Sequence, residues 1–208
     1  MRDDVGPRIG VLGGTFDPPH RAHLALARAA RDALTLDLVI VVPSGDSWRK
    51  ADSDVTPAAV RLQLTRAAFE DQPWVEVNDI EVRRRGPSYT AETLAELQAE
   101  HQFGAAGTAA RWWFILGQDA LVDLPHWHQP ERIVALARLA VAIRGDLEAA
   151  ELDAVGSVPE LRGRIDEVPF EALEVSATAI RAQLRAGDPS PDLSDEVLAL
   201  IDALGLYR

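Results

Sequence analysis

The 208-residue chain contains no cysteine, which excludes disulfide bonds, a cysteine nucleophile and thiolate metal sites. It also has no apolar run that approaches the ~18 residues of a membrane-spanning helix. Residues 1–6 lack the apolar core of a signal peptide. We therefore expect a soluble protein of the reducing cytoplasm.

Basic residues are few, because 21 Lys and Arg residues face 33 Asp and Glu residues and leave a net charge of −12. This balance argues against a nucleic acid or an anionic membrane as partner, since both require a basic face. A small nucleotide remains compatible, because a local cationic pocket is enough to bind it. With 47% hydrophobic residues, the chain is expected to form one globular domain over residues 1–208.

Short apolar or β-branched runs alternate with longer segments that have helical spacing. Strands are expected at residues 8–12, 38–42, 75–77 with 80–82, 112–116, 139–143 and 165–168, and helices at 24–34, 58–69, 90–100, 130–137, 177–186 and 196–204. The run at 38–42 is apolar on both sides, as in parallel strands covered on two faces. The pattern predicts an α/β fold: a single Rossmann-like domain with a parallel sheet of about six strands and helices on both faces.

The sequence GGTFDPPHRAHL at residues 13–24 lies between the first expected strand and the first expected helix. His20 and His23 are three residues apart, so both can lie on one face of the helix start. Free backbone N–H groups and the positive end of the helix dipole attract anions at that point. Gly13 and Gly14 let the backbone approach a ligand closely. The segment therefore predicts a phosphate site.

Other interpretations of this segment must be weighed. A zinc site would need more ligands, and the remaining histidines (His101, His126 and His128) follow no ligand spacing. Two surface histidines without a role remain an alternative. The glycines match neither the GxGxxG fingerprint of dinucleotide-binding proteins nor the GxxxxGK[ST] pattern of P-loop NTPases, which disfavours both classes.

Two further segments follow the second and third expected strands. PSGDSWRK at residues 43–50 ends in Lys50, whose ammonium group could contact a triphosphate, although most loop lysines are simply solvated. GPSYTAETL at residues 86–94 begins with a turn-forming Gly-Pro-Ser, and Thr90 is expected to cap the next helix.

Two more segments lie later in the chain. FILGQDAL at residues 114–121 places Asp119 at a helix start, where its carboxylate could accept hydrogen bonds from a ligand or merely cap the helix. Trp127 follows, and core packing is the alternative to a binding role for its indole ring. VSATAIR at residues 175–181 follows the last expected strand, with Ser176 as the expected N-cap.

Together these segments resemble the nucleotidyltransferase superfamily that carries the T/HxGH motif, and more narrowly the nicotinate mononucleotide adenylyltransferases. Residues 13–24 resemble their GGTFDPxHxGHL form, and residues 86–94 are similar to their GPSYTxDTL stretch. The sequence departs from the family pattern at Ala22, at residues 47–49 and at Glu92. The resemblance covers nearly the whole chain and is weakest over residues 144–165.

The resemblance implies transfer of the adenylyl group of ATP to nicotinate mononucleotide, which gives deamido-NAD and pyrophosphate. The residues that it implies are His20, His23, Lys50 and Arg181 for catalysis, Gly13, Gly14, Thr15, Phe16, Gly117, Asp119, Ser176 and Thr178 for ATP, and Ser44, Tyr89, Thr90 and Trp127 for nicotinate mononucleotide. Mg²⁺ is expected to arrive with ATP rather than in a protein cage, and a homo-oligomer is possible. The alternatives are a phosphopantetheine adenylyltransferase, which would leave residues 86–94 unexplained, and a non-catalytic nucleotide-binding regulator on the same fold.

Overall fold

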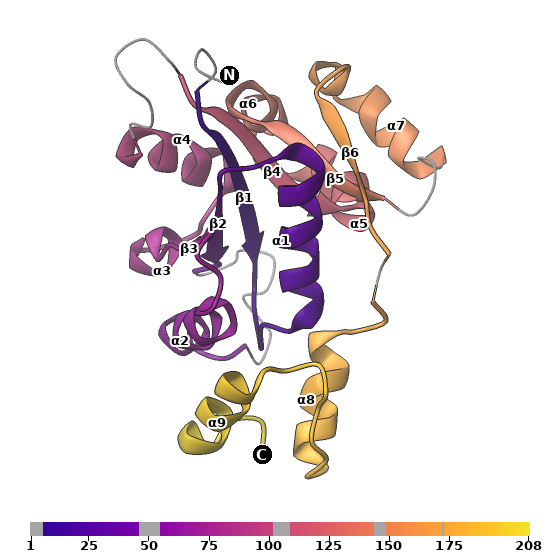
Figure 1. The fold of residues 1–208 in the computed structure, drawn as a ribbon. Helices are drawn as coiled ribbons and strands as arrows, with labels where there is room; N and C mark the ends of the chain where they lie inside the picture. The colour runs from indigo at the N-terminus through magenta and orange to yellow at the C-terminus, as the bar shows by residue number, and fades with distance from the viewer. Residues whose placement is uncertain (1–5, 46–54, 102–108, 144–148, 172) are drawn as a thin grey trace.

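The fold is described from a computed structural model, in which residues 6–45, 55–101, 109–143, 149–171 and 173–208 are described (Figure 1). Within these ranges, six parallel strands form one sheet in the order β3-β2-β1-β4-β5-β6. The strands are β1 (Arg8–Gly14), β2 (Leu38–Pro43), β3 (Val75–Val77), β4 (Arg111–Gly117), β5 (Arg138–Ile143) and β6 (Ile165–Pro169). The predicted parallel sheet is confirmed. The strand order reverses between β1 and β4, where open α/β sheets bind ligands at their carboxyl ends.

Helices connect the strands. They are α1 (Arg21–Leu34), α2 (Ala58–Phe69), α3 (Ile80–Arg83), α4 (Thr90–Glu100), α5 (Gln118–Asp123), α6 (Pro130–Leu136), α7 (Ala149–Ser157), α8 (Ala177–Arg185) and α9 (Asp195–Leu204), with 3-10 turns η2 (Leu124–His126) and η3 (Pro159–Leu161). The sequence pattern placed a helix start at Asp119 without giving the bounds of α5, and it did not predict α7. None of the helices in the described ranges is both long and apolar enough to cross a membrane.

The expected strand at residues 80–82 is wrong, because these residues form helix α3. The side-chain oxygen of Asn78 accepts the backbone N–H of Ile80 at 2.9 Å, and the N–H of Arg83 bonds the Asp79 carbonyl at 2.9 Å. Such a turn closed by an Asn side chain starts a helix instead of continuing a strand. A local apolar pattern cannot reveal that competition.

The expected capping role of Thr90 is also wrong. Helix α4 begins at Thr90 itself, and Tyr89 is its N-cap with no side-chain cap bond. The Tyr89 carbonyl accepts the N–H groups of Glu92 and Thr93, both at 3.0 Å, so Thr90 is already helical. The predicted range of the helix, residues 90–100, is confirmed. The predicted cap of α8 is confirmed, because the Ser176 hydroxyl accepts the Ala179 N–H at 3.1 Å.

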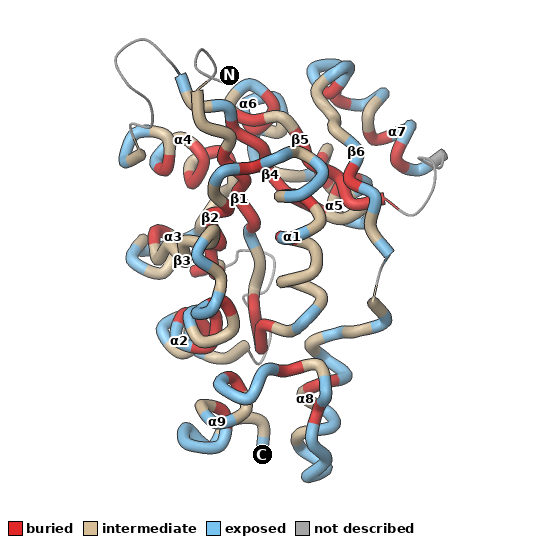
Figure 2. The backbone as a smooth tube through the Cα atoms, viewed as in Figure 1, coloured by how far each residue is buried: buried red, intermediate tan, exposed pale blue. Residues whose placement is uncertain are grey.

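Successive residues of β2 point to opposite faces of the sheet. Val39 and Val41 pack with residues of α1 and α2, whereas Ile40 and Val42 pack with residues of α3 to α6. All four side chains are at most 1% exposed. Figure 2 shows the same burial as red tube along the central strands. Helices therefore cover both faces, as the doubly apolar runs predicted.

Helices α8 and α9 form a separate layer with α2. Ile180 of α8 packs with Val197 and Ile201 of α9 and with Leu64 of α2. Figure 1 shows the two helices side by side at the end of the molecule toward which β1 points. This position brings the segment after β6 to the same end of the sheet as the segment after β1.

Candidate active site

A cavity of about 260 Å³ is lined by residues of β1, β2 and β4 and by the start of α4. The residues expected at a binding site from four separate segments do meet: Gly13, Gly14, Thr15, Ser44, Tyr89, Thr90 and Trp127 all line it. The Ser44 N–H bonds the Gly14 carbonyl at 2.8 Å, which joins the loops after β1 and β2. The cavity therefore lies beside the β1–β4 switch point of the sheet, on the side of β2.

Aromatic rings form one wall of the cavity. The Trp127 indole N–H donates to Asp123 Oδ2 at 3.1 Å, and the indole meets the Phe114 ring edge-on with 6.0 Å between the centroids. Tyr89 and His128 also line the cavity, with 4.3 Å between their ring centroids. Trp127 thus has a fixed orientation and a face available for a flat, apolar ligand group.

The two glycines of the turn have different roles. A Cβ atom at Gly14 would come within 3.0 Å of the Phe16 ring, whereas at Gly13 the nearest atom would be 3.7 Å away in Phe114. Phe16 is only 1% exposed and packs in the core, so any contact of this residue with a ligand must come from its backbone. Gly14 therefore allows the Phe16 ring to pack closely against the turn, and Gly13 is the glycine with more space beside it along the cavity.

His20 and His23 stand together at the start of α1. His20 is the N-cap, and its backbone N–H donates to Nδ1 of His23 at 3.1 Å. The two rings stack with 3.8 Å between their centroids. Arg21 between them pairs with Asp192 at 2.6 Å, so its charge is partly neutralised. The predicted shared face of the two imidazoles is confirmed.

Both histidines are neutral at neutral pH in the free protein. Burial lowers the pKa of His20 to about 4, against a smaller opposing effect of Asp192. Burial, reinforced by His20, lowers the pKa of His23 to about 3. The pair therefore offers hydrogen bonds, not fixed positive charge, to an incoming phosphate.

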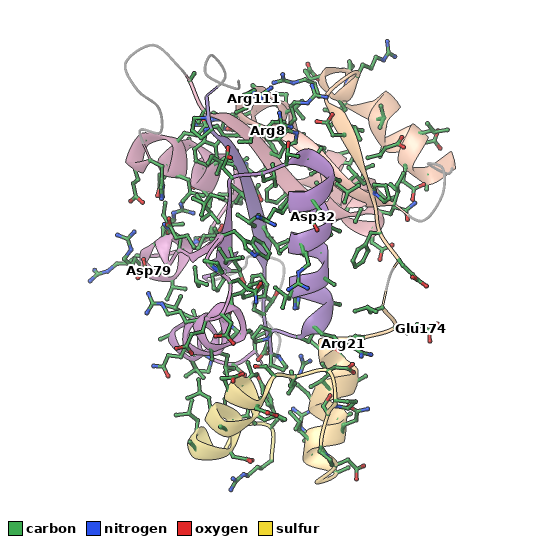
Figure 3. All side chains as sticks on the ribbon, viewed as in Figure 1. Arg8, Arg21, Asp32, Asp79, Arg111 and Glu174 are labelled. Atoms are coloured by element: carbon green, nitrogen blue, oxygen red, sulfur yellow. The ribbon has the colours of Figure 1, made fainter. Side chains whose placement is uncertain are left out.

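The residues expected to bind the other parts of ATP lie outside the cavity lining. Gly117 is the N-cap of α5, where a Cβ would meet no atom within 4 Å, and Asp119 lies in its first turn. Arg181 of α8 donates to the Asp17 carbonyl at 2.7 Å and to the Thr178 hydroxyl at 3.4 Å. Figure 3 shows Arg21 near α8, while Arg8 and Arg111 lie at the opposite end of the sheet. Lys50 lies outside the described residues.

Comparison with known proteins identifies the family. The family model described as cytidylyltransferase-like matches residues 11–183. The chain belongs to this family. Curated members named "Probable nicotinate-nucleotide adenylyltransferase" are similar over almost the whole chain: one from Roseiflexus sp. (strain RS-1) is 41% identical, covering 96% of this chain and 98% of the relative, and one from Chromobacterium violaceum is 37% identical, covering 98% and 100%.

Solved structures give the same fold. The nicotinic acid mononucleotide adenylyltransferase of Plasmodium falciparum complexed with NaAD matches with a TM-score of 0.74 at 17% identity, covering 97% of both chains. A putative nicotinate-nucleotide adenylyltransferase from Vibrio parahaemolyticus matches with a TM-score of 0.66 at 19% identity, covering 97% of this chain and 96% of the other. At these identities the likeness shows the fold of this cytidylyltransferase-like protein.

Arg61 of α2 is a site residue that the sequence analysis missed. Its side chain is 2% exposed and donates to the carbonyl oxygens of Thr15 and Ser44 at 2.6 Å each and of Thr56 at 2.8 Å. The Arg61 side chain therefore holds the segments after β1 and β2 in fixed positions relative to each other. No sequence signal marked it, because arginine side chains are almost never fully buried unless they are paired.

Glu81 of α3 is a second missed residue, and it lines the cavity. Its Oε1 accepts the Thr93 hydroxyl at 2.7 Å, and Arg84 donates to the same hydroxyl at 3.0 Å. Burial raises the pKa of Glu81, although these neighbours oppose the shift. The sequence analysis assigned this stretch to a strand and so gave Glu81 no place at the site.

Proposed function

We propose that this chain is a nicotinate-nucleotide adenylyltransferase of NAD biosynthesis, which joins ATP and nicotinate mononucleotide to form deamido-NAD and pyrophosphate. The observation that carries this assignment is the cavity shared by the glycine turn, the Tyr89–Thr90 helix start and Trp127. Family membership and the relatives of that name support it. The likeness to structures of such enzymes complexed with NaAD and with APC supports a nucleotide substrate.

The reaction proceeds without a covalent enzyme intermediate. An oxygen of the 5′-phosphate of nicotinate mononucleotide attacks the α-phosphorus of ATP in line, and a new P–O bond forms. The bond between the α-phosphorus and the bridging oxygen breaks, and pyrophosphate leaves with that electron pair. Positioning and electrostatic stabilisation supply most of the rate in such phosphoryl-type transfers.

We assign the histidine pair to the α-phosphate and the bridging oxygen. Because Nδ1 of His23 accepts the His20 N–H, the neutral ring of His23 carries its proton on Nε2. That N–H is a donor that can follow the charge developing on the phosphate oxygens. Arg181, and Lys50 outside the described residues, are assigned to the departing pyrophosphate.

ATP recognition is proposed to use the helix starts at the carboxyl end of the sheet. Gly117 and Asp119 are assigned to the adenosine, and Ser176 and Thr178 to the β- and γ-phosphates. Mg²⁺ is proposed to enter bound to ATP. Among the residues that the structure describes, no group of three or more His, Cys, Asp or Glu side chains is placed to hold a metal ion.

Pyrophosphate release from ATP with a panel of acceptors tests the assignment. Nicotinate mononucleotide should support turnover, and phosphopantetheine should not. Turnover with phosphopantetheine instead would place the chain in a different adenylyltransferase class. ATP binding without turnover on any acceptor would favour a regulator.

A further inference from the structure

Asp17 connects distant parts of the chain beside the histidine pair. It is 4% exposed and lies between the glycine turn and His20. Its Oδ2 accepts the backbone N–H of Thr56 at 3.2 Å, and its Oδ1 accepts the Tyr207 hydroxyl at 2.6 Å. Its carbonyl oxygen accepts Nη1 of Arg181 at 2.7 Å. Both the side chain and the backbone of this one residue are therefore held by other segments.

The bond from Tyr207 is the shortest of the three. Tyr207 follows α9, and its partner Asp17 is 190 residues earlier in the sequence. An O–H donor to a carboxylate at this distance is a charge-assisted hydrogen bond, about twice as strong as a neutral one. Burial and the bond to Asp17 raise the pKa of Tyr207, so the hydroxyl stays protonated and remains the donor.

Neither Asp17 nor Tyr207 lines the cavity. Both are nevertheless linked by hydrogen bonds to Arg181, which is assigned to the phosphates of ATP. The guanidinium of Arg181 is oriented by the Asp17 carbonyl on one side and by the Thr178 hydroxyl at 3.4 Å on the other. A shift of the Asp17 backbone would therefore move Arg181. Arginine contacts with phosphate are directional, so a small rotation weakens them.

We propose that Tyr207 is a positioning residue for ATP: its hydroxyl fixes Asp17, and the Asp17 carbonyl in turn holds the Arg181 guanidinium in place for the phosphates. The inference rests on the proposed function, because it takes the roles of Arg181 and ATP from there. It adds a residue beyond the C-terminal end of α9 to the residues that position ATP, and it assigns the effect of this residue to one of the two substrates.

The Tyr207→Phe variant tests this role, because it removes the hydroxyl and keeps the ring that packs against α9. The KM for ATP should rise about tenfold, as loss of one charge-assisted contact predicts, while the KM for nicotinate mononucleotide stays within about twofold. The dissociation constant of α,β-methylene-ATP, measured by calorimetry, should rise by the same factor. An unchanged constant for this analogue would refute the proposal even if the enzyme had no turnover.

The Ile201→Val variant is the matched control, because Ile201 is 2% exposed, packs in the apolar cluster that holds α9 and has no side-chain group that could hydrogen-bond Asp17. It should lower the melting temperature and leave both ATP parameters unchanged; an equal loss of ATP affinity would show that Tyr207 acts only through the stability of α9. In an Asp17→Ala background, which lacks both side-chain acceptor oxygens, Tyr207→Phe should have less than about a twofold further effect. If the effects of the two substitutions on ATP affinity were fully additive, a path through Asp17 would be refuted.

Absence of pyrophosphate release by the wild type would refute the proposed function alone. The dissociation constants of the ATP analogue decide the role of Tyr207 separately.

Discussion

The imidazole Nδ1 of His23 accepts a hydrogen bond of 3.1 Å from the backbone N–H of His20. This bond fixes the orientation of one ring, and the 3.8 Å stack fixes the other ring against it. Two charged imidazoles at that separation would repel each other, and burial already disfavours the charged forms. The pair is therefore preorganised as neutral donors at the helix start.

Replacing His23 by alanine should lower kcat by a factor of about 10²–10³, the usual effect of losing one transition-state donor. Steady-state kinetics beside a thermal melt measure the two effects separately. His101→Ala is the matched control, because His101 contacts Glu76 Oε1 at 3.1 Å and does not line the cavity. Near wild-type turnover of His23→Ala would remove the pair from the mechanism.

The lowered pKa of His23 predicts a loss of stability in acid. The ordinary pKa of 6.5 applies to the unfolded chain, and about 3 applies to the folded one. Below pH 6.5 His23 binds a proton in the unfolded chain but not in the folded protein. The stabilisation is therefore complete above pH 6.5 and declines as the pH falls toward 3.

Comparison of the wild type with His23→Gln isolates this effect, because glutamine keeps an acceptor for the His20 N–H. Between pH 7 and pH 5 the free energy of unfolding should fall by about 2 kcal/mol more in the wild type than in the variant. Urea titrations at both pH values measure it. Parallel losses in the two proteins would mean that His23 titrates normally in the folded state.

The sequence was sufficient to predict the features of the fold that leave a local, periodic pattern of apolar residues. The doubly apolar run of β2 and the alternation of strands and helices were enough for the parallel sheet, because burial on both faces leaves a direct mark on composition. The helix at residues 80–83 was missed because one side chain, Asn78, redirects the backbone. The support from Arg61 was missed for another reason: its partners Thr15 and Ser44 are 46 and 17 residues away in the sequence.

Replacing Arg61 by leucine should reduce the free energy of unfolding by at least about 3 kcal/mol, because several buried carbonyl oxygens lose their donor. Turnover should fall as well, since the loops after β1 and β2 lose their common support. Arg66→Leu is the matched control on the same helix, with a side chain that is 55% exposed. Chemical denaturation of both variants measures the difference, and equal small losses would contradict a structural role for Arg61.

Arg181→Ala should weaken the use of ATP and leave the affinity for nicotinate mononucleotide nearly unchanged. The reason is that a single charge-assisted contact to phosphate is worth about tenfold in affinity. KM values for both substrates measure the effect, with exposed Arg185→Ala on the same helix as control. Equal losses for both substrates would show that Arg181 supports the helix and does not contact ATP.

The start of α4 predicts a preference for nicotinate over nicotinamide mononucleotide. Tyr89 and Thr90 line the cavity at the N-terminus of this helix, where free N–H groups and the dipole favour an anion. A carboxylate accepts from two such donors, whereas a carboxamide turns its own NH₂ group toward one of them. The unpaired donor costs about 1–3 kcal/mol. Glu81 lines the same cavity and would repel an anion, but burial raises its pKa and Thr93 and Arg84 offset its charge.

The net preference should reach about 10²-fold or more in kcat/KM, because a site built for one hydrogen-bonding pattern strongly rejects the other. The measurement compares both mononucleotides at saturating Mg-ATP. Trp127→Phe supplies the control: it keeps an aromatic face for either pyridine ring, so it should lower both efficiencies without changing their ratio. Equal efficiencies in the wild type, or a preference for the amide, would overturn the role of the α4 start while leaving adenylyl transfer intact.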